Sequence, residues 1–411
     1  MITGISWRNL WRNKLRSLVI IAAVAIGILG AVLSDGFMEG MMDQRVNAAI
    51  DNEISNIQLH NPDFLLNNDI IYTISQPEQY LETIRELPQV KGVSQRIICA
   101  AMASTAAASA GVTIAGVDPE EEEKVSQISK AITLGAYLNN QQRIPVVIGK
   151  KLSDKLGLKI NDKLIVTLAD SSGTITYGAF LVSGIYQTSN NLFDETHVFV
   201  RAKDLGPMLG LTNQVHEMAI ALHDNQATQE VFQTLSDQFS SQIKNQKIDI
   251  KTWDMVEPLL KSMIEMMTFF SYMFLVIILI ALSFAIINTM TMAILERKRE
   301  IGMLMAIGMT KGRVFLMIML ETFFLSVTGG IVGLLLSYLI VSFYARHGLD
   351  LGAMGSGMSY IGYASTVYFR VNESFYVASV LLIGITSLLS SIPASIKALK
   401  LNPVEAIREI N

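Results

Sequence analysis

The chain has one cysteine, three tryptophans and five histidines among its 411 residues. A single cysteine cannot form an intramolecular disulfide, so any part of the chain outside the cytoplasm must be stable through its own hydrophobic core. We interpret Cys99 as a small buried residue in a strand, without a redox role.

Motifs for nucleotide binding, hydrolysis and metal binding are also absent. No G-x-x-x-x-G-K-S/T occurs, which excludes a Walker A phosphate loop within this sequence. The histidines are scattered without H-E-x-x-H spacing, and there is no G-x-S-x-G elbow. We therefore expect no catalytic residues and no metal site.

Apolar residues are abundant instead. Hydrophobic residues make up 51% of the chain and charged residues 17%, which is too apolar for an ordinary soluble enzyme and too charged for a wholly embedded bundle. Residues 35–265 hold 29 acids against 18 bases, although the net charge of the whole chain is only −4. The composition indicates a mixture of membrane and water-exposed parts.

Four long uncharged runs cover residues 17–34, 266–295, 322–345 and 375–396. Each is long enough to cross a hydrocarbon core of about 30 Å as a helix. Basic residues lie before the first run, between the second and third, and after the fourth: Arg8, Arg12, Lys14, Arg16, Arg297, Lys298, Arg299, Lys311, Arg313, Lys397, Lys400 and Arg408. By the positive-inside rule these three stretches are cytosolic.

The start of the chain allows two alternatives. The first run could be a cleaved signal peptide, but residues 31–36, A-V-L-S-D-G, are a poor cleavage site and residues 35–52 continue at helical spacing, which favours a retained span. Before the run, Ile2, Trp11 and Leu15 alternate with basic residues, which predicts a helix on the inner leaflet. Positive-inside anchoring alone would also explain this pattern.

A large outer domain is expected between the first two spans. Apolar alternations at 54–59, 146–148, 164–168 and 197–200 predict strands, and residues 77–87 and 226–243 predict helices. This order predicts two βαβ-type halves that fold together, with a strand-rich insert between them. We interpret the acidic residues 120–123 as a turn or helix start, and the glycines of the second outer segment as a sign of irregular backbone.

The cytosolic loop between the second and third spans is the most informative segment. Charged residues lead into Ile301, Leu304, Met305 and Ile307 at helical spacing, and Gly308 can end such a helix. A short helix with an apolar face is suited to dock in a groove on a soluble partner. A juxtamembrane charge cluster that only fixes topology is the alternative on spacing alone.

Residues 294–308, I-L-E-R-K-R-E-I-G-M-L-M-A-I-G, resemble the E-R-x-x-E-I-G-x-x-x-A-x-G hallmark of the FtsX/MacB/LolC-LolE permease family. Further similar segments are 7–17, the third span with Glu321 and its glycines, and 401–408, so the resemblance covers the whole chain. In that family the loop is the coupling helix on the ATPase. The resemblance therefore assigns ATPase coupling to Glu296, Arg297, Arg299, Glu300, Ile301, Leu304 and Gly308.

Two further patterns concern the spans. Ser326, Gly329, Gly330 and Gly333 recur at helical spacing in the third span and predict close helix packing. Glu321 lies near the inner boundary, where either a structural role or a transported-proton role is open. Residues 402–405, N-P-V-E, predict an N-cap, a first-turn proline and a capping glutamate of a short cytosolic helix.

Methionine is frequent, with 21 residues, and gathers at the outer ends of the first two spans. Flexible, polarizable methionines adapt to varied apolar ligands, so we hypothesise a lipid-accepting cavity there. Ordinary lipid-facing or core packing is the alternative. The proposed lining is Phe37, Met38, Met41, Met42, Met263, Met266, Met267 and Phe270.

The resemblance implies a non-catalytic permease subunit of an ABC transporter, a multi-pass protein of the bacterial inner membrane with its large domain in the periplasm. It would bind no cofactor itself, since ATP and Mg²⁺ would bind a separate cytosolic ATPase dimer of the LolD/MacB type. A second copy or a related permease subunit would complete the bundle, and membrane lipids would surround it. No nucleic-acid partner is expected.

ATP-driven closure would then move the outer domains by the mechanism that the family calls mechanotransmission, which need not pass the substrate through the membrane. Residues 43–62 resemble lipoprotein-release permeases, which favours release of lipoproteins, whereas the short hairpin at 169–176 departs from the long chaperone-binding hairpin of the LolC type. The alternatives are MacB-like efflux of peptides, drugs or toxins, an FtsX-like regulator of a periplasmic enzyme, and a receptor without an ATPase.

The expected fold is an α-helical membrane protein with four transmembrane helices and a large α+β outer domain, which by resemblance has a MacB-like porter part and the strand-rich insert. The expected segments are an amphipathic helix at 1–16, TM1 with its extension at 17–52, the outer domain at 53–253 with its insert at about 139–209, TM2 with its extension at 254–295, the coupling loop at 296–313, TM3 at 314–345, an outer loop at 346–373, TM4 at 374–396 and a C-terminal helix at 397–411.

Overall fold

The computed structural model describes residues 14–138 and 143–399. These residues form two compact units. The membrane unit comprises the described residues up to Met42, Ile264–Leu349 and the described residues from Val367 onward; the outer unit comprises Asp43–Met263 and Asp350–Thr366. The helix expected from Asn402, and the amphipathic helix expected at the start apart from residues 14–16, lie outside the described residues.

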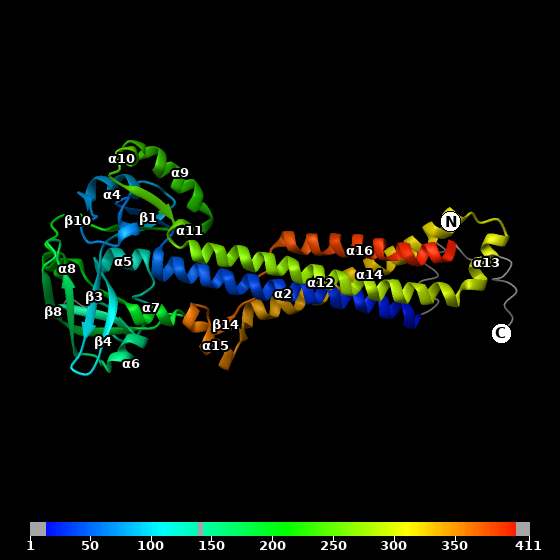
Figure 1. Cartoon of the computed structure of the whole chain (residues 1–411), viewed down its shortest axis with the longest axis horizontal. Helices are drawn as coiled ribbons and strands as arrows, with labels where there is room; N and C mark the ends of the chain where they lie inside the picture. The colour runs from blue at the N-terminus through cyan, green and yellow to red at the C-terminus, as the bar shows by residue number, and fades with distance from the viewer. Residues whose placement is uncertain (1–13, 139–142, 400–411) are drawn as a thin grey trace. The chain divides into compact units, whose positions relative to one another are not determined.

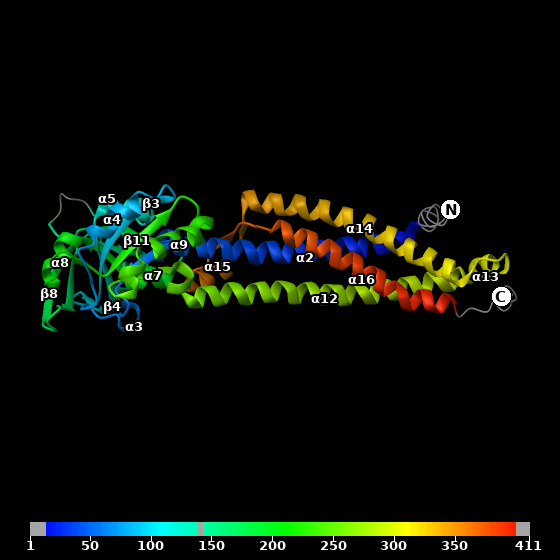
Figure 2. The ribbon, with the colours of Figure 1, turned by 90° about the horizontal axis from the view of Figure 1, so that it is seen from above.

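Four long helices make up most of the membrane unit, and they run alongside one another in both views (Figure 1, Figure 2). All four are long and apolar enough to cross a membrane. Because hydrocarbon offers no hydrogen-bond partners, a helix that satisfies its own backbone groups is the favoured form for such sequences. The helices are α2 (Lys14–Ala49), α12 (Pro258–Glu296), α14 (Lys311–His347) and α16 (Glu373–Leu399).

The loop between the second and third candidate spans forms a short helix, α13 (Lys298–Ala306), between α12 and α14. Gly308 ends it with φ +104°, a value that a glycine adopts without strain. The amide of Met309 donates to the carbonyl of Leu304 at 3.0 Å, and that of Gly308 to the carbonyl of Met305 at 3.1 Å. These two bonds form a Schellman motif, so the helix has a defined end.

The outer unit is built on one ten-stranded sheet of order β12-β1-β11-β3-β4-β9-β6-β8-β5, in which β7 pairs with β3 and β8. The pairs are antiparallel except β4 with β9 and β6 with β8. The strands are β1 (Ile57–His60), β3 (Val90–Ser104), β4 (Ser109–Val117), β5 (Ile132–Gly135), β6 (Pro145–Gly149), β7 (Lys163–Ala169), β8 (Ile175–Tyr186), β9 (His197–Arg201), β11 (Glu217–Leu222) and β12 (Asp249–Thr252).

Two βαβ units interleave at one end of this sheet. Strand β11 lies antiparallel between β1 and β3, and β1 lies antiparallel between β11 and β12. Strands β1 and β3 are therefore parallel and joined through α4 (Glu78–Arg85), while β11 and β12 are parallel and joined through α9 (Thr228–Gln238) and α10 (Ser240–Lys244). The expectation of two βαβ halves that fold together is confirmed.

The insert does not form a sheet of its own. Strand β3 is long enough to pair with β11 near its start and with β4 and β7 towards its end. The inserted strands β6 to β9 join the same sheet through β3 and β4. A periodicity argument could not reveal this, because pairing partners in a sheet are set by long-range packing.

A large hydrophobic core packs helices against the sheet. It contains side chains of α4, α6 (Lys150–Leu156), α8 (Ala202–Leu209) and α9, with the fully buried Phe180 of β8. A smaller core gathers Tyr186, Phe193 and Phe199 around α7 (Asn191–Thr196). The acidic residues 120–123 lie in α5 (Pro119–Val125), whose first turn is capped by Asp118, which confirms a helix start there.

The remaining elements of the outer unit are short. They are η1, a π-helical turn (Ile50–Ile54), α3 (Phe64–Asn67), β2 (Ile74–Ser75), β10 (Gln214–Val215), η2 (Asn225–Ala227), α11 (Trp253–Val256), α15 (Ala353–Met358) and η3 (Ser359–Ile361). The glycine-rich second outer segment is thus more regular than expected, since α15 includes Gly355 and Gly357. The strands β13 (Leu349–Asp350) and β14 (Thr366–Val367) pair at its ends.

Candidate functional site: the coupling loop, the outer cavity and the helix clamp

The start of α13 is tied to α14 by an ion pair. Arg297 Nη1 lies 3.1 Å from both carboxylate oxygens of Glu321, and its Nε donates to Glu300 at 3.0 Å. The side chains of Arg297 and Glu321 are only 12% and 11% exposed. Arg297 is therefore engaged within the chain, and the pair supports the structural role for Glu321.

The apolar side chains of α13 divide between two directions. Ile301 is buried at 2% exposure and Leu304 is partly buried, whereas Met303 is 53% and Ile307 is 79% exposed. Met303 and Ile307 are four residues apart and so share one face of the helix end. This exposed apolar face, which we call the α13 face, is available to a partner, and Ile301 is not part of it.

The small residues of α14 lie against α2. A Cβ on Gly329 would lie 2.8 Å from the Cβ of Val24, and a Cβ on Gly333 would lie 2.9 Å from the carbonyl oxygen of Ala25. Real Cβ contacts are not that short, so both glycines permit close helix packing. Ser326 is buried and donates to the carbonyl of Thr322 at 2.9 Å.

Gly330 is in a different position from Gly329 and Gly333. A Cβ there would lie 3.8 Å from Ile28 Cδ1, an ordinary contact. Gly330 and Ser326 line an apolar cavity of about 320 Å³ among α2, α14 and α16, together with Ile28 and Leu388. They therefore border a space as well as a neighbouring helix.

A second cavity, which we call the outer cavity, lies in the membrane unit and has a volume of about 150 Å³. Three of the methionines proposed as a lipid lining do line it: Met38, Met42 and Met267. Polar groups make up much of the rest. The full lining is Asp35, Met38, Glu39, Met42, Ile264, Met267, Thr268, Ser271, Tyr272, Asn372, Ser374 and Phe375.

The other proposed lining residues lie elsewhere. Met41 is buried at 6% exposure, and the ring of Phe37 packs edge-on against Phe369 with centroids 5.9 Å apart. Met266 is 50% exposed, and Met263 and Phe270 are partly exposed. The methionine stripe therefore does not form one continuous cavity wall.

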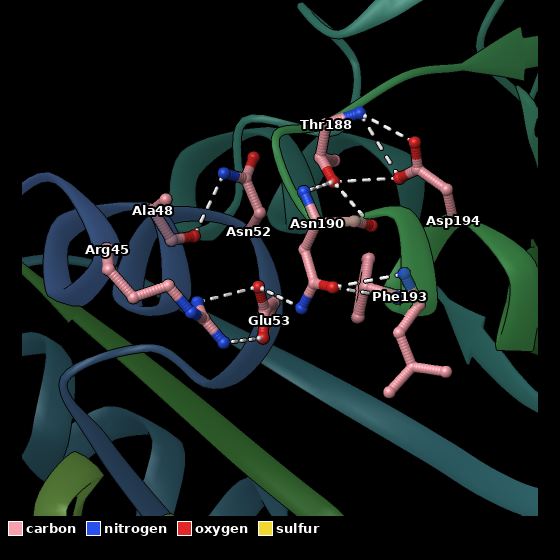
Figure 3. A network of polar contacts seen from close by, with 9 residues as sticks. Arg45, Ala48, Asn52, Glu53, Thr188, Asn190, Phe193 and Asp194 are labelled. Atoms are coloured by element: carbon pink, nitrogen blue, oxygen red, sulfur yellow. Dashed lines mark hydrogen bonds and ion pairs between the residues drawn. The ribbon is translucent and has the colours of Figure 1, made fainter. Parts of the chain in front are cut away.

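A polar network, which we call the helix clamp, holds the outer end of α2 (Figure 3). Arg45 donates to both oxygens of Glu53 at 3.0 and 3.2 Å, and Asn190 Nδ2 donates to Glu53 at 3.0 Å. Asn190 also caps α7, since its Oδ1 accepts from the amides of Leu192 and Phe193. Thus one carboxylate, that of Glu53 in the π-helical turn η1, contacts both α2 and the N-cap of α7.

The clamp continues to Asp194. Thr188 donates to this carboxylate from its amide at 3.0 Å and from its hydroxyl at 2.7 Å (Figure 3). Burial raises the pKa of Asp194 to about 6, although the Thr188 hydrogen bonds act to lower it. A Cβ at Gly149 would clash with the backbone of Asp194, so only glycine lets β6 approach this closely.

The second outer segment also contacts the clamp. A Cβ at Gly362 would lie 2.5 Å from Arg45 Nε, and Gln44 donates to the carbonyl of Thr366 at 3.1 Å. Lys151 Nζ lies 5.6 Å from the centre of the Tyr360 ring. Residues Asp350–Thr366, which connect α14 to α16, are thus packed with α2 and the insert in the outer unit.

The sequence matches two families of known proteins. Residues 17–238, more than half of the chain, match the MacB-like periplasmic core domain, and residues 272–403 match the FtsX-like permease C-terminal domain. The chain belongs to this family of ABC transporter permeases. The permease is therefore a membrane protein with four apolar helices and a MacB-like periplasmic domain, and such membership implies an ATPase partner.

Curated relatives of the permease are distant. It is 23% identical to the lipoprotein-releasing system transmembrane protein LolC of Neisseria meningitidis serogroup B, over 95% of this chain and 94% of LolC. It is 24% identical to an uncharacterised ABC transporter permease of Methanocaldococcus jannaschii over 67% of this chain, and 25% identical to the macrolide export ATP-binding/permease protein MacB of N. meningitidis serogroup A over 64%. It spans 64% and 38% of those two proteins.

Two solved structures of transporter domains match about half of the chain. The extracellular domain of the transporter YknZ covers 48% of this chain at 14% identity, with a TM-score of 0.33. The periplasmic region of MacB from Actinobacillus actinomycetemcomitans covers 50% at 9% identity, with a TM-score of 0.36.

Some residues of the permease site escaped the sequence analysis. Asp35 and Glu39 share a helix face with Met38 and Met42 at spacings of three and four residues, so the acidic part of the outer cavity could have been found from that pattern. The clamp could not, because Glu53 and Asn190 are 137 residues apart. Within residues 14–138 and 143–399, no group of three His, Cys, Asp or Glu side chains is placed to hold a metal.

Proposed function

We propose that the permease is a non-catalytic subunit that converts ATP hydrolysis by a separate cytosolic ATPase dimer of the LolD/MacB type into movement of its periplasmic domain. The complex would lie in the bacterial inner membrane and contain a second copy of this chain or a related permease. Its substrate would be a lipoprotein released from that membrane. The near full-length similarity to LolC supports this substrate over efflux of peptides or drugs.

The observation that carries the mechanical part is the continuity of α2. This helix runs without interruption from Lys14 to Ala49, and Arg45 near its end is held by Glu53, which Asn190 of the insert also contacts. A helix with satisfied backbone bonds resists bending, so a displacement at its inner end is carried along it. The clamp then passes that displacement to the sheet.

The α13 face is where the proposed ATPase would act. Met303 and Ile307 are exposed apolar side chains in the proposed cytosolic loop. Substitution of such anchor residues by small or charged residues weakens a helix-in-groove contact most. The neighbouring Arg299 is exposed and provides charge at the rim. Ile301 would support α13 from inside the chain and would not touch the ATPase.

The test uses the permease and its ATPase in proteoliposomes with a fluorescent triacylated lipopeptide. The double variant Met303→Asp with Ile307→Asp should lose ATPase association at least tenfold and lose ATP-dependent lipopeptide release. Ile307→Leu keeps the face apolar, and Thr310→Asp adds a charge at the N-cap of α14, where aspartate is favoured; both should behave as wild type.

Two results would contradict the proposal. Undiminished release by the double variant would remove α13 from the coupling role. ATP-dependent transport of a peptide or drug without any release of lipopeptide would replace lipoprotein release by MacB-like efflux.

A further inference from the structure

The outer cavity contains two carboxylates that the coupling function does not use. Asp35 and Glu39 are four residues apart on α2, and both line the cavity. Asp35 is 7% exposed, and the hydroxyl of the buried Ser271, which donates to Met38 Sδ at 3.6 Å, also lies within hydrogen-bond reach of its carboxylate. A carboxylate offers about four acceptor positions, so one hydroxyl leaves most of this capacity directed at the cavity.

The lining offers these carboxylates no counter-ion. None of its twelve residues is lysine, arginine or histidine. Like charges four residues apart on a helix repel each other, and an ionised carboxylate removed from water is costly unless a cation or several hydrogen bonds compensate it. A cationic group in the outer cavity would offset both costs.

The remaining wall suits the apolar part of such a ligand. Met38, Met42 and Met267 are flexible and polarizable, so they adapt to alkyl groups of varied shape. The rings of Tyr272 and Phe375 lie 6.1 Å apart, and aromatic faces attract cations. An apolar cavity of about 150 Å³ admits a benzene-sized molecule, so this one has room for a small ammonium group.

The position of the cavity fits an amphipathic ligand. Asp35 is 18 residues beyond Ser17, which is about 27 Å along the helix and near the outer limit of a hydrocarbon core of about 30 Å. A molecule held there can keep an alkyl chain in the outer leaflet while its charged head enters the cavity. A fully water-soluble cation would gain nothing from the methionines.

We propose that the outer cavity binds the cationic head of an amphipathic amine or quaternary ammonium compound, with Asp35 and Glu39 as its counter-ions. Binding requires only the permease. That such a molecule is also cargo rests on the proposed function.

The test measures binding of radiolabelled dodecyltrimethylammonium to the full permease in nanodiscs of zwitterionic lipid. Wild type should bind it saturably at one site per chain, and octaethylene glycol dodecyl ether, a neutral molecule with the same chain, should not compete. The variant Asp35→Asn with Glu39→Gln should bind at least tenfold more weakly. Glu265→Gln removes an exposed acid of α12 outside the cavity lining and should bind as wild type.

A cavity-filling variant tests the same site without a change of charge. Met267→Trp should also abolish saturable binding, so the inference stays testable if the double variant does not fold. The inference is overturned if the double variant binds as tightly as wild type, if Glu265→Gln weakens binding equally, or if Mg²⁺ or the neutral ether displaces the probe.

Addition of the ATPase separates this inference from the proposed function. Dodecyltrimethylammonium should stimulate ATP hydrolysis with wild type and not with Asp35→Asn with Glu39→Gln. Binding without stimulation would support the site and reject the cargo role. If wild type shows no saturable binding of dodecyltrimethylammonium while Met303→Asp with Ile307→Asp still uncouples the ATPase, this inference is rejected and the proposed function remains intact.

Discussion

Two pairs of charged residues that lie close together in the sequence differ in how their charges are compensated. Arg45 and Glu53 in the helix clamp form a bidentate pair, and Asn190 adds a further hydrogen bond. Asp35 and Glu39, about two turns before Arg45, line a cavity whose wall contains no cation. A carboxylate paired with a cation of the same chain stabilises the contact between the elements that it joins. A carboxylate without such a cation can still accept hydrogen bonds from a ligand and compensate its charge.

The most fully compensated buried charges of this comparison lie in the outer unit. Arg96 on β3 donates to both oxygens of Glu122 at 3.0 and 2.6 Å and to Glu217 at 2.7 Å. Burial acts to lower the pKa of Arg96, but the two carboxylates outweigh it and raise that pKa. One guanidinium thus joins β3, α5 and β11.

The largest effect should follow from removal of this guanidinium. Arg96→Met would leave Glu122 and Glu217 buried without a cation, which we expect to cost about 3–5 kcal/mol of unfolding free energy. Maleimide labelling of Cys99 reports the loss, because burial raises the pKa of this thiol to about 12 and the folded chain should react slowly.

The matched control is Arg85→Met. Arg85 pairs with Glu121 at 2.7 Å, but its side chain is 48% exposed, so the expected cost is below about 1 kcal/mol. Equal labelling rates for the two variants would contradict the distinction between compensated burial and a surface pair.

Asp194 is an intermediate case, with hydrogen bonds from Thr188 but no cation in contact. Its folded-state pKa of about 6 lies above the ordinary value of 3.8, so the folded chain binds a proton between about pH 4 and 6 that the unfolded chain does not. Its contribution to stability therefore increases as the pH falls through 6 and is lost as the pH rises, by about 2 kcal/mol.

Unfolding of wild type and Asp194→Asn should be compared across this pH range. The free-energy difference between them should shift towards wild type as the pH falls from 7 to 4. A difference that does not change with pH would mean that Asp194 is ionised throughout and compensated like Glu53.

A smaller effect is expected at the clamp itself. Glu53→Gln keeps the shape and one acceptor but leaves Arg45 without a carboxylate, at a cost of about 1–1.5 kcal/mol. Hydrogen exchange should increase at η1 and α7, and lipopeptide release should fall while ATP hydrolysis continues. Glu230→Gln, the same change at an exposed position of α9, should alter neither; similar exchange in both variants would mean that the clamp does not hold these elements.

Sequence reasoning succeeded where one local property decides the outcome. The four helices follow from length and apolarity, and the two βαβ units follow from element order. It failed where a side chain's direction or a distant partner decides. Ile301 and Ile307 are both apolar residues of the same loop, yet the first is buried and the second exposed. Sequence analysis assigned Arg297 to ATPase coupling but could not identify its ion-pair partner, because Glu321 is 24 residues away.

The smallest expected effect has the opposite sign. Without ligand, Asp35→Asn with Glu39→Gln removes the repulsion and the burial of uncompensated charge. The unfolding free energy of the purified permease, measured by thermal unfolding, should therefore increase by less than about 1 kcal/mol. Glu265→Gln, an exposed acid on α12, should produce no shift. A decrease in stability of the double variant would show that these acids are compensated within the chain, as Glu53 is.

Added dodecyltrimethylammonium should then reverse this order. A ligand that binds only the folded chain stabilises it by about 2.7 kcal/mol at a hundred times its Kd, and only wild type retains both counter-ions. Wild type should therefore become more stable than Asp35→Asn with Glu39→Gln, although it starts below it. If the two acids bind a ligand, the stabilities of wild type and variant, plotted against ligand concentration, should cross. If the acids instead stabilise the fold, wild type should be more stable than the variant at every concentration.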